Sequence, residues 1–134
     1  MEDMYREIIV ERYKNPGYFG ELDPKDISFQ DENPLCGDNI RIDLVLDGDK
    51  IADAKFNGHG CAISMASADL LLEDIIGKTL TEVKELKKED ILDLLGIELG
   101  PVRLKCALLS LKVLKGGVYG LGGEKFHLDE DDEI

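Results

Sequence analysis

The sequence predicts an α+β fold, in which a small antiparallel three-stranded sheet is covered on one face by helices. Alternating apolar and polar residues over 40–46 and 51–57 flank a short turn, a pattern typical of a β-hairpin. Apolar residues at helical spacing over 62–76 and 102–115 indicate helices that can cover the apolar face of that hairpin. A chain of 134 residues is long enough for one compact domain with a single core.

The first helix is predicted between residues 2 and 14. Asn15-Pro16-Gly17 ends it, because proline and glycine interrupt a helical run. A loop follows, and then Ile27 to Gln30 are expected to form a short strand. The residues of the first helix that recur at helical spacing are Tyr5, Ile8, Ile9, Arg12 and Tyr13.

The hairpin is the clearest local pattern. Ile40, Ile42, Leu44 and Leu46 alternate with polar residues, and Asp47-Gly48-Asp49 supplies small polar turn residues. The return strand is expected to place Ala52, Ala54 and Phe56 on one face. Cys36 enters the hairpin and Cys61 leaves it. Because the strands are antiparallel, these two residues should lie close together.

Helices are predicted for most of the remaining chain. The helix that starts at Ala62 ends at Gly77, Thr79 caps a short helix with Glu82 at the capping-box position, and 91–95 is helical. Pro101 suits a first helical turn, and Gly116-Gly117 is expected to end the last helix. We therefore assign residues 1–117 to one domain and 118–134 to a glycine-rich and then acidic tail, expected to be mobile.

Composition excludes several classes of function. The net charge of −13 and the lack of a basic stripe argue against nucleic acid as a partner. No apolar run approaches the roughly 18 residues of a membrane span, and the acidic N-terminus is unlike a signal peptide. The odd count of three cysteines does not fit a disulfide framework, so we expect a cytoplasmic protein.

Each cysteine is set beside glycine or a charged residue. Cys36 and Asp38 flank Gly37, so a thiolate and a carboxylate can converge on one ion. Cys61 comes just before a predicted helix, whose N-terminus favours a thiolate. Cys106 lies near the start of the last helix, beside the cations of Arg103 and Lys105. Three thiolates and one carboxylate suit Zn²⁺ or iron, and the alternative is three unrelated cysteines.

Three motifs carry a family resemblance. Residues 33–38 (Asn-Pro-Leu-Cys-Gly-Asp), 60–68 (Gly-Cys-Ala-Ile-Ser-Met-Ala-Ser-Ala) and 101–107 (Pro-Val-Arg-Leu-Lys-Cys-Ala) resemble the IscU/SufU/NifU-N family of iron–sulfur cluster assembly scaffolds. The resemblance implies that Cys36, Cys61 and Cys106 hold a nascent cluster, [2Fe–2S] in type, or Zn²⁺, with Asp38 as the labile fourth ligand. It also implies a cysteine desulfurase as sulfur donor, with Cys36 and Cys106 as persulfide acceptors, and apo-proteins as cluster recipients.

The branch of the family is open at this point. Lys105 and Arg103 resemble the SufU branch, whose zinc-bound members relay sulfur, whereas the short segment 80–100 is closer in length to IscU. We expect mainly a non-catalytic scaffold, monomeric or weakly self-associating. The alternatives are a zinc-dependent sulfurtransferase that relays persulfide and a structural zinc domain that binds proteins.

Neighbouring polar residues have plainer explanations. His59 is expected to be an exposed loop residue, and Ser64 and Ser67 to be small helix-packing residues. Lys105 either pairs with Asp38 when metal is absent or is a solvated helix lysine. Arg103 either steers an incoming persulfide or forms an ordinary surface ion pair, which would contribute little stability.

Overall fold

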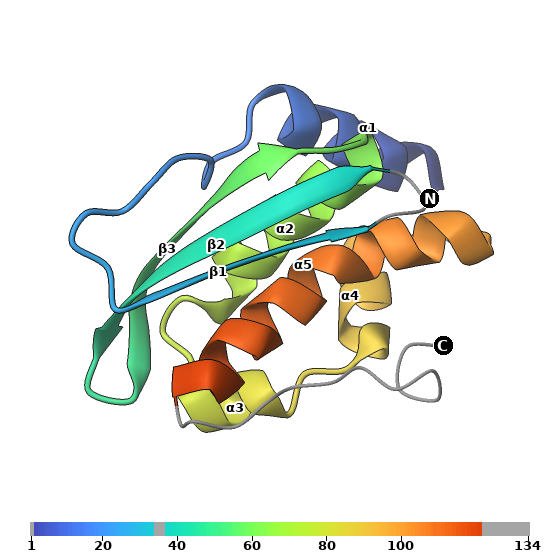
Figure 1. The fold of residues 1–134 in the computed structure, drawn as a ribbon. Helices are drawn as coiled ribbons and strands as arrows, with labels where there is room; N and C mark the ends of the chain where they lie inside the picture. The colour runs from blue at the N-terminus through green and yellow to red at the C-terminus, as the bar shows by residue number, and fades with distance from the viewer. Residues whose placement is uncertain (1, 34–36, 122–134) are drawn as a thin grey trace.

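The computed structural model describes residues 2–33 and 37–121 and contains three strands and five helices in this part of the chain. The strands form one sheet in the order β1-β2-β3, with both pairs antiparallel. Helices α2 and α5 lie against one face of this sheet, and α1 packs on α2 (Figure 1). The predicted α+β fold is therefore confirmed. The elements are α1 Glu2–Lys14, β1 Ile27–Asn33, β2 Asp38–Asp47, β3 Lys50–His59, α2 Ala62–Ile75, α3 Leu80–Lys84, α4 Lys88–Leu95 and α5 Pro101–Leu121.

The core lies between the sheet and the two long helices. Ile40, Ile42 and Leu44 of β2 are all buried, as their alternation predicts. The return strand contains an irregularity, because the pairing register shifts between Val45 and Leu46 of β2. Ile51 is consequently buried while Ala52 is exposed, so the prediction that Ala52 shares the buried face of Ala54 and Phe56 is wrong.

Helix α5 is longer than predicted. It continues through Gly116-Gly117 to Leu121, so the expectation that these glycines end it is wrong. A Cβ on Gly116 would lie 2.8 Å from the Phe29 ring, and one on Gly117 would lie 2.9 Å from an Ile27 methyl. The glycines therefore let β1 pack directly onto the helix, which offsets their cost of about 1 kcal/mol each in helix propensity. The predicted tail, 118–134, begins inside this helix, and residues 122–134 lie outside the described part.

Two buried carboxylates fasten the N-terminal region to the rest of the fold. Asp69 of α2 accepts hydrogen bonds from the Arg12 guanidinium at 2.9 Å and from the Tyr18 N–H at 2.8 Å. Asp43 of β2 accepts hydrogen bonds from the Leu22 N–H in the loop after α1 at 3.3 Å and from the Ser28 hydroxyl at 2.8 Å. These contacts hold α1 and the loop after it in place, at the cost of burying two charges.

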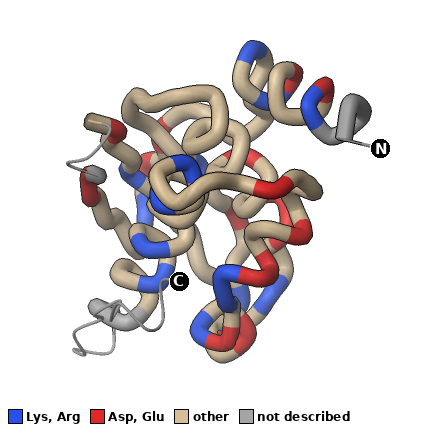
Figure 2. The backbone as a smooth tube through the Cα atoms, turned by 90° about the vertical axis from the view of Figure 1, so that its right-hand side faces the viewer, with Lys and Arg blue, Asp and Glu red and all other residues tan. Residues whose placement is uncertain are grey.

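The short helices and the charges complete the fold. Thr79 and Glu82 form the predicted capping box at the start of α3. Lys and Arg as well as Asp and Glu occur along the backbone in Figure 2, but α5 contains basic residues and no acidic one, whereas α2 contains acidic residues and no basic one. None of the described helices has the length and apolar character that crossing a membrane requires.

Candidate metal centre

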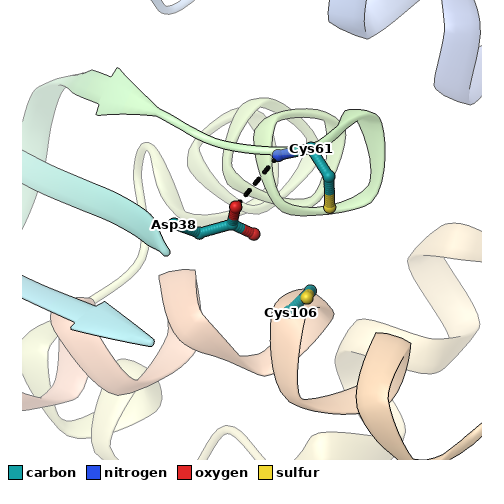
Figure 3. Close-up of side chains that lie close together, drawn as sticks. All are labelled: Asp38, Cys61 and Cys106. Atoms are coloured by element: carbon teal, nitrogen blue, oxygen red, sulfur yellow. Dashed lines mark hydrogen bonds between the residues drawn. The ribbon is translucent and has the colours of Figure 1, made fainter. Parts of the chain in front are cut away.

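The candidate centre lies where β2 begins, β3 ends and the helices α2 and α5 come together. Asp38 is the first residue of β2, Cys61 is the N-cap of α2, and Cys106 is in the second turn of α5. One donor atom from each, a carboxylate oxygen and two sulfurs, lies within 4.8 Å of the other two. Figure 3 shows the three side chains pointing into the same space between the strand end and the two helices.

Antiparallel pairing produces this convergence. Asn39 pairs with His59, so Asp38 on one strand and Gly60 after the other are neighbours. The Cys61 N–H donates a hydrogen bond of 3.2 Å to Oδ1 of Asp38, which joins the start of β2 to the start of α2. Asp38 and Cys106 are only 4 % and 3 % exposed, while Cys61 is half-buried. Of these three residues, Cys61 is therefore the most accessible to solvent.

Two glycines make the approach to Cys61 possible. Gly58 has a φ of +120°, and a Cβ there would overlap the backbone carbonyl of Asn39. A Cβ on Gly60 would overlap the Ser64 hydroxyl and lie 3.0 Å from Cγ of Asp38. The spacing Gly58-x-Gly60-Cys61 therefore lets the strand end bend into the helix while a carboxylate and a hydroxyl crowd the same point.

Ser64 contributes a hydroxyl to this wall of the centre. Its Oγ lies 3.7 Å from Sγ of Cys61 and donates a hydrogen bond of 3.1 Å to the Cys61 carbonyl. The side chain is fully buried. The sequence-based expectation of a packing residue is therefore incomplete, because the hydroxyl also contacts a candidate ligand.

The donor set fits Zn²⁺ or iron. Thiolate sulfurs are preferred ligands of both, and a carboxylate oxygen completes mixed sites. Four tetrahedral ligands at zinc–sulfur bond lengths lie about 3.8 Å apart, so donors within 4.8 Å need only a small closure. A bound cation would also balance the negative charge of the buried Asp38 carboxylate.

The other residues singled out from the sequence are placed as follows. Cys36 lies outside the described residues, so its distance to the centre stays a prediction. Lys105 is half-buried and Arg103 is exposed, both in the first turns of α5. His59 is exposed, as expected, but it is the last residue of β3 and does not lie in a loop.

Sequence reasoning missed the crowding around Gly60 and the contact of Ser64 with Cys61. A usable pattern was present, since Ser64 stands three residues after the N-cap, where helical geometry turns a side chain back toward the cap. Serine is also common as a packing residue in helices, so the position of Ser64 alone does not distinguish the two roles.

Comparison with known proteins places the chain in a family. The model of the NifU-like N-terminal domain matches residues 4–126. The zinc-dependent sulfurtransferase SufU of Bacillus subtilis is 39 % identical, with 88 % of this chain and 91 % of that protein covered. The iron–sulfur cluster assembly scaffold protein IscU of Haemophilus influenzae is 34 % identical, with 85 % and 92 % covered.

A solved structure agrees with this placement. The SUF-system protein FiSufU of Fervidobacterium islandicum superposes with a TM-score of 0.73 at 33 % identity, covering 84 % of this chain and 94 % of that one. The N-terminal part of a NifU-like protein from Brucella abortus has the same fold, with a TM-score of 0.71 at 20 % identity and coverage of 91 % and 96 %. The family model and the relatives agree over most of the sequence, and the chain belongs to the NifU-like N-terminal domain family.

Proposed function

We propose that the chain is an iron–sulfur cluster assembly scaffold. It accepts sulfur from a cysteine desulfurase, binds iron and a transient cluster, and passes the cluster to apo-proteins. The observation that carries this proposal is the meeting of Asp38, Cys61 and Cys106 at one point, with their donor atoms within 4.8 Å of one another. The 34 % identity to a relative named as a cluster assembly scaffold supports it.

The proposed ligands are Cys36, Asp38, Cys61 and Cys106. Cys36 is included because it stands two residues before Asp38 in the sequence, within the motif Asn-Pro-Leu-Cys-Gly-Asp that carries the family resemblance. Asp38 is the ligand suited to exchange, because iron and zinc hold a carboxylate oxygen less firmly than a thiolate in a sulfur-rich site. Cys36 and Cys106 are the candidate persulfide acceptors in this scheme.

A second candidate function is a zinc-dependent sulfurtransferase that relays persulfide sulfur. The observation that favours it is the 39 % identity to SufU over 88 % of this chain. In that case Zn²⁺ occupies the centre at rest, and a sulfur-bearing partner displaces one ligand. The same four residues serve both functions, so the two differ in what accumulates on the protein.

The deciding experiment is anaerobic purification followed by metal and acid-labile sulfide analysis. The metal-free protein is then incubated with a cysteine desulfurase, cysteine, ferrous iron and a thiol reductant, which supplies electrons to convert persulfide sulfur into the sulfide of a cluster. A scaffold is expected to develop the visible absorption of a bound cluster and then to transfer that cluster to an apo-ferredoxin. The sulfurtransferase predicts the opposite result, in which zinc-loaded protein accelerates the desulfurase and no cluster absorption develops. A protein that shows neither behaviour would leave only the structural zinc domain.

A further inference from the structure

The hydroxyl of Ser64 contacts the sulfur of Cys61, and helix packing alone does not require this contact. Helix α2 has Cys61 at its N-cap and Ser64 at its third residue, and the sulfur and the hydroxyl oxygen lie 3.7 Å apart. Gly60 leaves the room for this contact, since a Cβ there would overlap Oγ of Ser64. Asp38 approaches the same point, with its Cγ 3.0 Å from that Cβ position.

The direction of the hydrogen bonds depends on whether the sulfur carries a proton. A neutral thiol of Cys61 donates S–H to Oγ of Ser64, and the serine O–H donates to the Cys61 carbonyl at 3.1 Å. A metal that binds this sulfur replaces the thiol proton, and a thiolate can only accept. The single proton of the serine hydroxyl then has two competing acceptors, the carbonyl and the charged sulfur, and hydrogen bonds to charged acceptors are the stronger ones.

We propose that Ser64 is a positioning residue of the metal centre, whose hydroxyl turns from the Cys61 carbonyl to the Cys61 sulfur when that sulfur binds a metal ion. The proposal rests on the proposed function, because it assumes that Cys61 is a ligand. The hydrogen bond fixes the sulfur's orientation and draws electron density from it, as outer partners of metal ligands do.

Ser67 provides a matched control. It lies in the same helix, is equally buried, and donates a hydrogen bond of 2.6 Å to the Ile63 carbonyl one turn earlier. Ser64→Ala and Ser67→Ala therefore each remove one buried hydroxyl and one bond to a backbone carbonyl. They differ in that the first also removes the hydroxyl that faces Cys61.

The test uses Co²⁺ as the probe, followed by competition with Zn²⁺, on the full-length metal-free protein. Ser64→Ala is expected to lower metal affinity about 10-fold, in the range for loss of an outer partner, and to move the sulfur-to-cobalt charge-transfer band to lower energy. The band moves because the sulfur electrons are no longer stabilised by a hydrogen bond. Ser67→Ala should leave the band and the affinity unchanged, even where it lowers the melting temperature as much.

The outcomes separate this proposal from the proposed function. Wild-type protein without a sulfur-to-cobalt band would overturn both. A normal wild-type band that Ser64→Ala and Ser67→Ala leave alike would overturn the role of Ser64 alone. Should Ser64→Ala not fold, Ser64→Thr decides the matter because it keeps a hydroxyl. Ser64→Thr is expected to retain the wild-type band, and a shifted band in that variant would contradict the proposal.

Discussion

The N-termini of α2 and α3 share one contact, a carboxylate that accepts the N–H of the N-cap residue, but the two carboxylates come from different places. In α3 the N–H of the N-cap Thr79 donates to the carboxylate of Glu82 at 3.0 Å, three residues later in the same helix. In α2 the N–H of the N-cap Cys61 donates to the carboxylate of Asp38 at 3.2 Å, which belongs to β2. Glu82 is exposed, whereas Asp38 is buried.

The carboxylate that contacts the N-cap of α2 comes from another element, and this has two consequences that the cap within α3 does not have. Because Asp38 supplies the carboxylate, the third residue of α2 is free to be Ser64, whose hydroxyl faces the Cys61 sulfur. The carboxylate is also carried to within 4.8 Å of the sulfurs of Cys61 and Cys106. The carboxylate of Glu82 satisfies backbone groups at the start of α3. The corresponding carboxylate at the start of α2, that of Asp38, is in addition one of the candidate metal donors.

The two N-termini also lie at opposite ends of β3. Thr79 pairs with Lys50 at the start of the strand, and His59 at its end leads through Gly60 into Cys61 (Figure 1). Changes at one end can therefore be made without touching the other, which makes the comparison open to experiment.

Replacing Asp38 is expected to have the largest effect. Asp38→Asn keeps an oxygen that accepts the Cys61 N–H but loses the charged ligand, so zinc affinity should fall by at least about 100-fold, because loss of a ligand should exceed the loss of an outer partner. Asp38→Ala also leaves the partly buried Cys61 N–H without that acceptor, which costs up to about 1–3 kcal/mol in unfolding free energy, the range for a fully buried group. Zinc competition titration and urea unfolding of the metal-free protein measure the two quantities.

The two Asp38 variants check each other. If Asp38→Asn loses as much unfolding free energy as Asp38→Ala, the carboxylate acts through its charge and not as a cap. If neither variant changes zinc affinity, Asp38 is only a cap, like Glu82, and the comparison between the two helices loses its functional meaning.

The sequence predicts both N-termini but only part of their difference. The cap of α3 follows from four consecutive residues, and Cys61 and Asp38 follow from glycine spacing and hairpin geometry. The bond between Asp38 and Cys61 joins residues 23 positions apart, and a local pattern does not encode it. The same limit applies to Asp69, whose buried ion pair with Arg12 spans 57 positions.

Glycine is the residue whose role the sequence conveys least. Gly116 and Gly117 suggest the end of a helix, yet they are the positions at which β1 touches α5. The sequence alone does not show whether a glycine ends a helix or makes room for a neighbouring strand. In this structure the positions of Ile27 and Phe29 against α5 show that the second role applies. The register shift at Val45 likewise arises from strand pairing and not from composition.

A methyl group on Gly60 is expected to have the next largest effect. Gly60→Ala places a Cβ against the Ser64 hydroxyl and 3.0 Å from Cγ of Asp38. Overpacking of this kind costs about 1–3 kcal/mol, and the displaced donors should weaken zinc binding as well. Gly17→Ala is the control, since a Cβ there has nothing within 4 Å. Thermal unfolding with and without Zn²⁺ measures both effects, and equal behaviour of the two variants would contradict the crowded geometry.

Loss of the local cap should destabilise the fold without affecting the centre. Thr79→Ala removes the hydroxyl that accepts the Glu82 N–H at 3.2 Å, and N-cap replacements of this type cost about 1 kcal/mol. Zinc affinity should stay at the wild-type value, because α3 begins at the far end of β3. A parallel loss of zinc affinity would mean that the two ends of the sheet are coupled.

The smallest effect is expected from the charge of Glu82 itself. Hydrogen bonds from the Thr79 N–H and from the Thr79 hydroxyl lower the pKa of Glu82 below its ordinary value of 4.5. A lowered pKa means that the ionised carboxylate stabilises the fold above the unfolded-state pKa and that this contribution is lost as pH falls through the folded-state pKa. Glu82→Gln keeps an acceptor without a charge, so it should unfold slightly more easily than wild type at pH 7 and equally easily once both side chains are neutral. Urea unfolding of the two proteins over an acid pH series measures the difference between their unfolding free energies. The contributions of all other carboxylates are the same in both proteins and cancel in this difference. If the difference in unfolding free energy between the two proteins did not change with pH, α3 would need an acceptor at this position but no charge. A charged carboxylate would then matter only at the N-terminus of α2, where it is also a candidate metal donor.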